Sequence, residues 1–142
     1  MTQPEILIVG AGGMGSLFGS ILQENGLKVV LYDTNTEHIR AIQQAGLKIE
    51  GYGGDRTIPI AATSNLSELE SAEIIFFQCK SHGTRQASKA VKPLITQESV
   101  CISFQNGLGN EEVMAEELGE DSVMGGLTAM AGVLLEPGKI RD

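Results

Sequence analysis

The chain has 142 residues, which suits one domain of ordinary size. Hydrophobic residues make up 42% and charged residues 20% of the sequence, which excludes a disordered segment and a coiled coil. Ten Lys and Arg against eighteen Asp and Glu give a formal net charge of −8, which argues against a nucleic-acid or anionic-membrane partner. Residues 6–22 are uncharged, but glycines interrupt them and no basic residue precedes them. We therefore expect neither a signal peptide nor a membrane span, and a cytoplasmic location.

The first 46 residues predict the order strand, helix, strand, helix. Residues 5–10 form a β-branched run that ends in glycine, which is typical of a strand buried on both faces. The apolar residues that follow recur at helical spacing and predict the inner face of a helix: Met14, Leu17, Phe18, Ile21 and Leu22. Gly26 is expected to end this helix in the left-handed conformation.

Residues 28–33 predict the second strand. Asn35 is placed to cap the next helix, whose inner face carries Ile39 and Ile42 and which ends at Gly46. Such a βαβ unit implies parallel strands. The residues 47–50 and 56–60 flank a glycine-rich turn and predict a small β-hairpin, with Pro59 at a sheet edge. The polar residues 64–71 are a short helix or turn.

Two further parallel strands are expected at residues 73–78 and 99–104, with a helix over residues 84–91 between them. Asn110 is the predicted cap of an acidic helix that reaches Leu118, and residues 122–135 are rich in strand-forming residues. Pro137-Gly138 marks a turn, and residues 139–142 would only begin a return strand. The expectation is one domain over residues 1–142, truncated from a longer chain: an α/β, Rossmann-type, doubly wound and mainly parallel sheet with a β-hairpin insertion.

The segment Gly10-Ala11-Gly12-Gly13-Met14-Gly15 matches the pattern G-x-G-x-x-G between the first strand and the first helix. Gly10 is expected to make the tight turn, Gly12 to let a diphosphate approach the backbone, and Gly15 to let the helix pack against the strand. The free N–H groups and the dipole of the helix start favour an anion. We therefore expect residues 10–15 to bind a dinucleotide, against the alternative of a glycine-rich turn without a ligand.

Asp33 ends the second strand, 23 residues after Gly10, near the ~20 expected for an acid that binds the adenosine ribose. Its carboxylate would accept hydrogen bonds from the ribose hydroxyls and would repel a 2′-phosphate. No arginine follows it until Arg40. On this ground NAD(H) is favoured over NADP(H), although Asp33 could also serve only to start a helix.

Lys80 and Asn106 each follow a predicted strand end, where ligands of open α/β sheets bind. Lys80 could contact a phosphate, ribose or substrate carboxylate, and Asn106 could bridge cofactor and substrate; a surface lysine and a turn asparagine are the alternatives. His38 is expected to be exposed on its helix, and His82 to lie near the crevice. Cys79 and Cys101 read as small buried residues in a reducing compartment. No metal site is expected, because Cys79 and His82 have no second ligand pair.

With these residues in place, the sequence resembles the N-terminal domain of the ketopantoate reductase (2-dehydropantoate 2-reductase) family. The resemblance rests on the glycine motif through Gly19, the strand leading into Lys80, the stretch Gln105-Asn-Gly-Leu-Gly-Asn-Glu-Glu112, and Gly126-Leu-Thr with Pro137-Gly138. It implies that Gly10 to Gly15, Lys80, Asn106 and Ala131 bind the cofactor, with Ala131 at the nicotinamide end. It also implies reduction of ketopantoate to pantoate, usually with NADPH, in pantothenate and coenzyme A biosynthesis.

The same resemblance places the proton-donating lysine in a helical C-terminal domain that is absent from this chain. Asn106 and Lys80 are then the catalytic candidates that remain, and the chain alone is expected to bind dinucleotide without reducing a 2-oxoacid. Two alternatives stay open: a non-catalytic dinucleotide-sensing module, and a reductase of another 2-oxoacid. The sequence is compatible with a homodimer.

Overall fold

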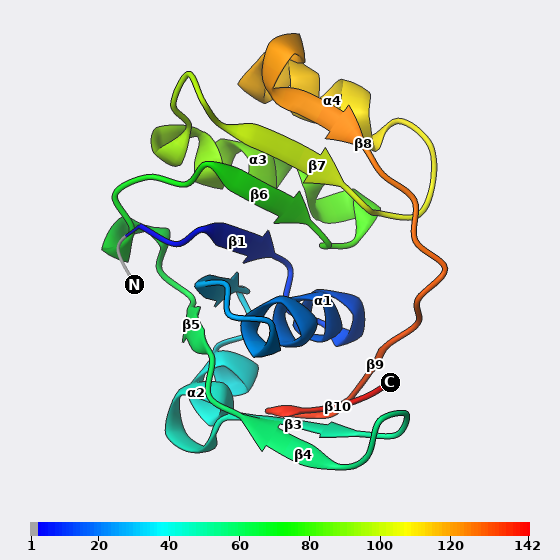
Figure 1. The fold of residues 1–142 in the computed structure, drawn as a ribbon. Helices are drawn as coiled ribbons and strands as arrows, with labels where there is room; N and C mark the ends of the chain where they lie inside the picture. The colour runs from blue at the N-terminus through cyan, green and yellow to red at the C-terminus, as the bar shows by residue number, and fades with distance from the viewer. Residues whose placement is uncertain (1–2) are drawn as a thin grey trace.

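The structure, a computed structural model, describes residues 3–142 and contains two β-sheets (Figure 1). The larger sheet has the strand order β5-β2-β1-β6-β7-β8, and every neighbouring pair in it is parallel. Its strands are β1 (Ile6–Val9), β2 (Val29–Tyr32), β5 (Ala61–Thr63), β6 (Ile74–Phe77), β7 (Val100–Ser103) and β8 (Val123–Gly125). The predicted parallel sheet is confirmed, and β5 is a strand that the sequence pattern did not indicate.

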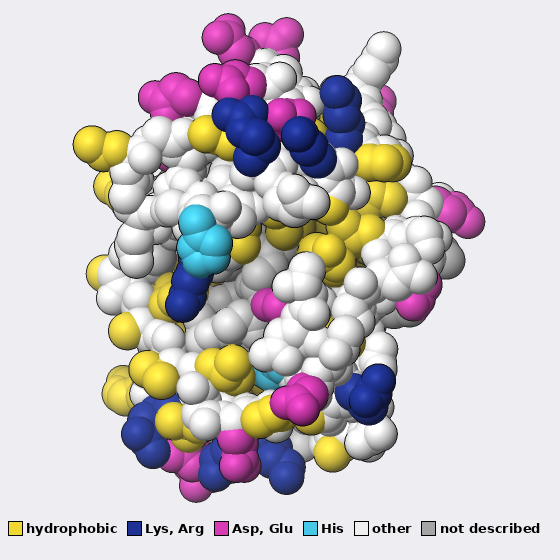
Figure 2. All heavy atoms as spheres, turned by 180° about the vertical axis from the view of Figure 1, so that it is seen from behind, with side chains coloured by type: hydrophobic (Ala, Val, Ile, Leu, Met, Phe, Trp, Pro, Cys, Tyr) yellow, Lys and Arg dark blue, Asp and Glu magenta, His cyan; other side chains and the backbone are white. Residues whose placement is uncertain are grey.

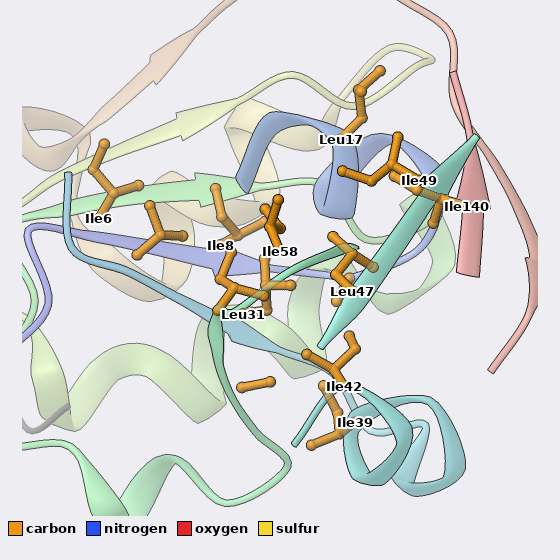
Figure 3. Packing of buried hydrophobic residues seen from close by; sticks show 14 residues of the cluster. Ile6, Ile8, Leu17, Leu31, Ile39, Ile42, Leu47, Ile49, Ile58 and Ile140 are labelled. Atoms are coloured by element: carbon orange, nitrogen blue, oxygen red, sulfur yellow. The ribbon is translucent and has the colours of Figure 1, made fainter. Parts of the chain in front are cut away.

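Helices cover both faces of this sheet, which confirms the doubly wound arrangement. They are α1 (Gly13–Glu24), α2 (Thr36–Ala45), α3 (Thr84–Val91) and α4 (Asn110–Leu118), with short 3-10 turns at Leu66–Glu68, Ser81–Gly83, Lys92–Leu94 and Glu120–Ser122. Successive side chains of a strand point to opposite faces. Ile6 and Ile8 of β1 accordingly pack in the hydrophobic cluster on the α1 side (Figure 3). Leu7 and Val9 pack in the cluster with α3 and α4.

The predicted hairpin is present and belongs to a second sheet, of order β4-β3-β10-β9. Strands β3 (Leu47–Glu50) and β4 (Arg56–Ile58) pair antiparallel, while β10 (Lys139–Arg141) runs parallel to β3 and antiparallel to β9 (Val133–Glu136). Ile140 of β10 is fully buried in the same cluster as Leu17 of α1 (Figure 3). The two chain segments that form this sheet thus cover the side of α1 that faces away from the large sheet (Figure 1).

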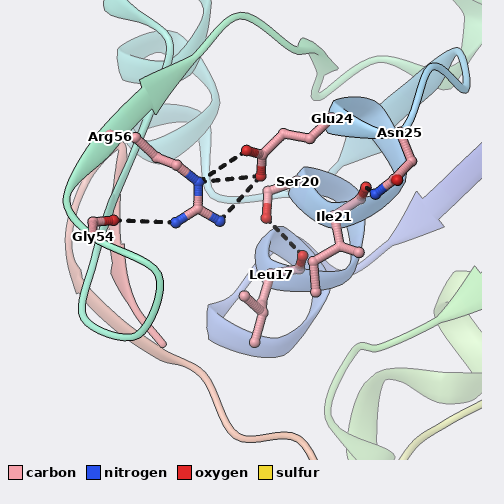
Figure 4. A network of polar contacts seen from close by, with 7 residues as sticks. All are labelled: Leu17, Ser20, Ile21, Glu24, Asn25, Gly54 and Arg56. Carbon is pink, nitrogen blue, oxygen red and sulfur yellow. Dashed lines mark hydrogen bonds and ion pairs between the residues drawn. The ribbon is translucent and has the colours of Figure 1, made fainter.

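Polar contacts join the far end of α1 to the hairpin. The guanidinium of Arg56 binds both carboxylate oxygens of Glu24, with Nε 3.0 Å from Oε2 and Nη2 3.0 Å from Oε1, and also donates to the carbonyl of Gly54 (Figure 4). This pair is partly exposed, so it fixes geometry more than it adds stability.

Packing between two sheets changes which face of α1 is buried. The predicted inner face included Ile21, which is 36% exposed, and Met14, which is only partly buried. The buried residues are mostly small: Gly15, Ser16, Leu17, Gly19 and Ser20. Small side chains let a helix approach the backbone on either side closely, and hydrophobic periodicity alone gives them no weight.

Two smaller expectations also need correction. Asn110 is the first residue of α4 and not its cap; the cap position is Gly109, with a left-handed φ of +90°. The carboxamide of Asn110 instead accepts from Thr84 Oγ1 at 3.0 Å and donates to the carbonyl of Asn106 at 3.1 Å. The predicted strand-rich run 122–135 contains β8 and the start of β9, but residues 126–132 between them form no helix or strand.

No helix among residues 3–142 combines the length and apolar character needed to cross a bilayer.

Candidate functional site

The glycine motif forms a tight turn from β1 into α1, as predicted. Gly10 has a φ of +103°, and a methyl group there would overlap the backbone of Cys79. A methyl group on Gly15 would overlap the carbonyl oxygen of Gly10. Both positions therefore require glycine for the turn and for close packing of the helix, as the motif indicates.

The other two glycines of the motif have different surroundings. A methyl group on Gly13 would overlap the backbone of Gly132, so the chain just before β9 packs directly against the start of α1. A methyl group on Gly12 would meet nothing within 4 Å. Gly12 is the cap position of α1, and the first N–H groups of a helix lack partners within it. Open space beside these donors leaves room for an anion.

Asp33 is bound to the glycine turn. Its Oδ2 accepts from the backbone N–H of Ala11 at 2.7 Å, and its Oδ1 accepts from the N–H of Asn35 at 2.8 Å. The predicted acid therefore lies at the rim of the turn, at the carboxyl end of β2, with a partly buried side chain. Each carboxylate oxygen has a further lone pair, so these two bonds leave acceptors for ribose hydroxyls.

A cavity of about 690 Å³ has six of the ten predicted cofactor residues in its walls. It is lined by residues of the glycine turn (Gly10, Gly12, Gly13 and Met14), by Asp33, and by residues that follow β6, among them Gln78, Lys80 and His82. The space-filling view from behind shows the surface hollowed on this side of the molecule (Figure 2). The structure thus brings His82 to the crevice, as predicted, although Ala11 and Gly15 lie behind the lining.

A second cavity of about 260 Å³ lies beside the first one and contains Asn106. Met14, Gln78, Cys79 and Lys80 line both cavities, so the two are neighbours. The carbonyl of Asn106 accepts from Ser81 Oγ at 2.8 Å, which ties the loop after β7 to the loop after β6. Ala131 is exposed and lines neither cavity, although its neighbours Met130 and Gly132 do; its contact with the nicotinamide end remains a prediction.

Gln78 is a site residue that the sequence reasoning did not single out. It follows β6 directly and lines both cavities. Its Nε2 atom is buried and has no hydrogen-bond partner among residues 3–142. The rule that pointed to Lys80, namely a polar residue at the end of a parallel strand, would also have pointed to Gln78.

His38 is buried, not exposed as expected. It is 1% exposed, its Nδ1 accepts from the N–H of Gly138 at 2.9 Å, and its Nε2 lies 3.4 Å from Ser16 Oγ. Burial lowers the pKa of His38 below its ordinary value. The helical pattern around His38 gave no sign of this, because the partner that buries it lies 100 residues away along the chain. His38 therefore joins α2 to the turn before β10 and is not part of the cavity.

The two cysteines are not poised for chemistry. Both are free, Cys101 is buried and Cys79 is partly buried. Burial raises the pKa of each thiol to about 11, so both are protonated at neutral pH and are weak nucleophiles. Among residues 3–142, no group of three or more His, Cys, Asp and Glu side chains is arranged to hold a metal ion.

Known proteins are similar to this chain in sequence and in fold. The family described as ketopantoate reductase PanE/ApbA matches residues 6–142. A 2-dehydropantoate 2-reductase from Pyrococcus abyssi is 36% identical over 137 residues, and one from Lactococcus lactis is 30% identical over 138 residues. Each alignment covers 96% of this chain and 44% of the relative, so the chain spans less than half the length of these relatives.

Solved structures agree with the sequence comparison. A PanE/ApbA family ketopantoate reductase from Ralstonia eutropha superimposes with a TM-score of 0.89 at 29% identity, over 96% of this chain and 45% of that one. D-mandelate dehydrogenase, in a ternary structure with NADH and anilino(oxo)acetate, gives a TM-score of 0.87 at 25% identity, over 96% of this chain and 44% of that one. The chain belongs to the ketopantoate reductase PanE/ApbA family, and it corresponds to the N-terminal, Rossmann-type part of these relatives.

Proposed function

We propose that the chain is the cofactor-binding half of a nicotinamide-dependent reductase that converts ketopantoate to pantoate. The observation that carries this proposal is the cavity that runs from Asp33 past the glycine turn to Lys80, beside the cavity of Asn106. Family membership supplies the substrate class. The activity itself is proposed for the whole protein, of which such a cofactor half is one part.

The residues present fit a dinucleotide. The donors at the start of α1 face open space at Gly12 and suit the diphosphate, and Asp33 suits the adenosine ribose. When bound, the nicotinamide supplies a hydride to the ketone carbon. Lys80 and Asn106 line the neighbouring cavity, which supports a role for them in holding the substrate or the nicotinamide end. Protonation of the alkoxide needs an acid, which the family resemblance assigns to a lysine outside this chain.

We further propose that NAD(H) binds more tightly than NADP(H). The Asp33 carboxylate is fixed by two backbone N–H groups at the place where a 2′-phosphate would lie, and like charges repel there. Arg40 is exposed on α2 and does not line the cavity. With NADP(H), a 2′-phosphate takes the place of a ribose hydroxyl that would donate to Asp33. The loss of such a hydrogen bond to a charged group costs about 1.5–3 kcal/mol.

Fluorescence titration of the chain with NADH and NADPH tests both proposals. NADH is expected to bind more tightly than NADPH. Asp33→Asn is expected to shift the ratio of the two affinities about 10-fold toward NADPH. Arg40→Gln is the matched control and should leave the ratio unchanged. Tighter NADPH binding by the unmodified chain would refute the preference, and the absence of binding by either would refute the proposed function. The chain alone is expected to show no turnover of NADH with ketopantoate.

A second candidate is the reduction of a different 2-oxoacid. It is favoured by the similarity to D-mandelate dehydrogenase, whose structure contains NADH and anilino(oxo)acetate. A panel of 2-oxoacids assayed with the whole protein separates the two candidates. A dinucleotide-sensing module would need the glycine turn and Asp33 but not polar groups at the nicotinamide end. The presence of Lys80 and Asn106 argues against such a module.

The free thiols of Cys79 and Cys101 support the expected cytoplasmic location.

A further inference from the structure

The backbone of Gln78 is held in the large sheet directly after β6. Its N–H donates to the carbonyl of Val9 at 2.8 Å, which extends the pairing of β6 with β1 by one residue. By alternation its side chain lies on the same face as that of Phe76. Phe76 packs edge-to-face against Phe18 and Phe104, with ring centroids 6.2 and 5.2 Å apart. The carboxamide therefore emerges beside a cluster of aromatic rings.

The amide nitrogen of Gln78 lacks a partner in this environment. Nε2 is buried without a hydrogen bond among the described residues, whereas the nearby Gln105 donates to the carbonyl of Cys79 at 2.9 Å and to Thr84 Oγ1 at 2.8 Å. Buried polar groups are almost always hydrogen-bonded, because an unpaired donor loses its hydration without compensation. This donor lines two cavities, so it is available to a ligand that enters either of them.

The strand order gives the position of that ligand atom. The neighbouring strands β2, β1 and β6 are directly followed by Asp33, by the glycine turn and by Gln78, respectively. Adjacent strands lie about 4.8 Å apart, so Gln78 lies about 10 Å across the sheet from Asp33, with the turn between them. A dinucleotide whose adenosine ribose lies at Asp33 and whose diphosphate lies at the turn extends its other nucleoside toward Gln78.

We infer that the Gln78 carboxamide donates a hydrogen bond to an oxygen of the nicotinamide nucleoside, either the amide oxygen of the base or a ribose hydroxyl. The inference rests on the proposed function and adds to it a residue that orients the nicotinamide end beside Lys80 and Asn106. Gln78 stands at the end of a strand, so its donor has a fixed direction. A hydrogen bond to this donor restricts the rotation of the nicotinamide nucleoside, because the acceptor oxygen must stay within reach of Nε2.

Calorimetric titration of Gln78→Met in the 142-residue chain tests this inference with NADH, ADP-ribose and ADP. Methionine keeps the length of the side chain and removes the donor. NADH affinity is expected to fall about 3- to 10-fold while ADP affinity stays unchanged, because ADP has no second nucleoside. A loss with ADP-ribose as well assigns the acceptor to the ribose, and a loss with NADH alone assigns it to the base.

Thermal unfolding of the free chain separates binding from a structural role. Gln78→Met is expected to keep or raise the melting temperature, since it removes an unpaired buried donor. Gln43→Met is the matched control: Gln43 Nε2 donates to the carbonyl of Ala62 at 2.8 Å, away from the cavities, so this variant should melt lower and bind NADH normally. Unchanged NADH affinity of Gln78→Met, or an equal loss with ADP, overturns the inference. A failure of the unmodified chain to bind any of the three ligands would instead overturn the proposed function.

Discussion

Replacing Gly12 by alanine is expected to weaken dinucleotide binding strongly while the fold keeps its stability. An added methyl group at Gly12 meets no protein atom within 4 Å, and its φ of −70° is open to any residue. Alanine restricts the unfolded chain, which stabilises by about 0.4–1 kcal/mol, but it is a poorer cap residue than glycine by a similar amount. These opposite effects cancel to within about 0.5 kcal/mol, so the melting temperature should shift by no more than about 2 °C.

Gly15→Ala in the same motif is expected to lower the stability of the fold. Its methyl group would overlap the carbonyl oxygen of Gly10 and would lie 2.9 Å from the carbonyl carbon of Gly10 and 3.2 Å from Ile8 Cγ2. Backbone atoms cannot rotate away, so the helix must shift, at a cost of about 1–3 kcal/mol or more. The better helix propensity of alanine returns about 1 kcal/mol. Because the overlap is with backbone atoms, the cost lies at the upper end of that range, and the net loss of about 2 kcal/mol corresponds to a melting temperature lower by about 4–8 °C.

Thermal unfolding and calorimetric titration with NADH measure the two effects separately. Gly12→Ala should melt like the unmodified chain and bind NADH about 10- to 100-fold more weakly, because the methyl group occupies space that the diphosphate needs. Normal NADH affinity in Gly12→Ala would refute the assignment of this turn as the diphosphate site. A melting temperature unchanged in Gly15→Ala would refute the packing argument.

Two further variants test the second sheet and the buried histidine. Ile140→Ala is expected to lower the free energy of unfolding by about 2–5 kcal/mol because Ile140 is fully buried, while Val133→Ala, at a position 56% exposed on the same sheet, should change it little; urea unfolding measures both. The pKa of His38 lies below its ordinary value of 6.5, so below pH 6.5 the unfolded chain binds more protons than the folded chain. The free energy of unfolding should therefore decrease as the pH is lowered. His38→Asn retains an acceptor for the Gly138 N–H and should flatten this dependence between pH 7 and 5.5; an identical slope in both proteins would contradict the assignment.

The sequence predicted elements whose signal is local. β1 and β2 follow from short continuous apolar runs, and α1 follows from apolar residues at helical spacing. Gly26, which follows α1, has the expected left-handed φ of +92°. β5 was not predicted because it has only three residues and joins the sheet solely by pairing with β2. The pairing of β10 with β3 joins residues about 90 positions apart, and no local pattern encodes such a partner.

The candidate site was predictable for the same reason and to the same extent. The turn at Gly10, the carboxylate of Asp33 and the strand ends at Lys80 and Asn106 are marked by residue type at a strand end. Gln78 is equally marked, yet its importance depends on the absence of a partner, which is a property of three-dimensional packing. His38 was wrongly expected on the surface because its partner Gly138 lies 100 residues away along the chain, in the turn between β9 and β10.

The glycine turn is shaped by contacts from distant parts of the chain rather than by its own six residues. The backbone of Cys79 packs against Gly10, the carboxylate of Asp33 binds the N–H of Ala11, and the backbone of Gly132 packs against Gly13. A loop held in this way has little conformational freedom left to lose on binding, which favours affinity for a ligand that fits it. Asp33 accordingly has two roles, as an anchor of the turn and as the proposed ribose acceptor. Asparagine is the informative substitution there, because its amide oxygen can still accept from Ala11 while the charge that would repel a 2′-phosphate is removed.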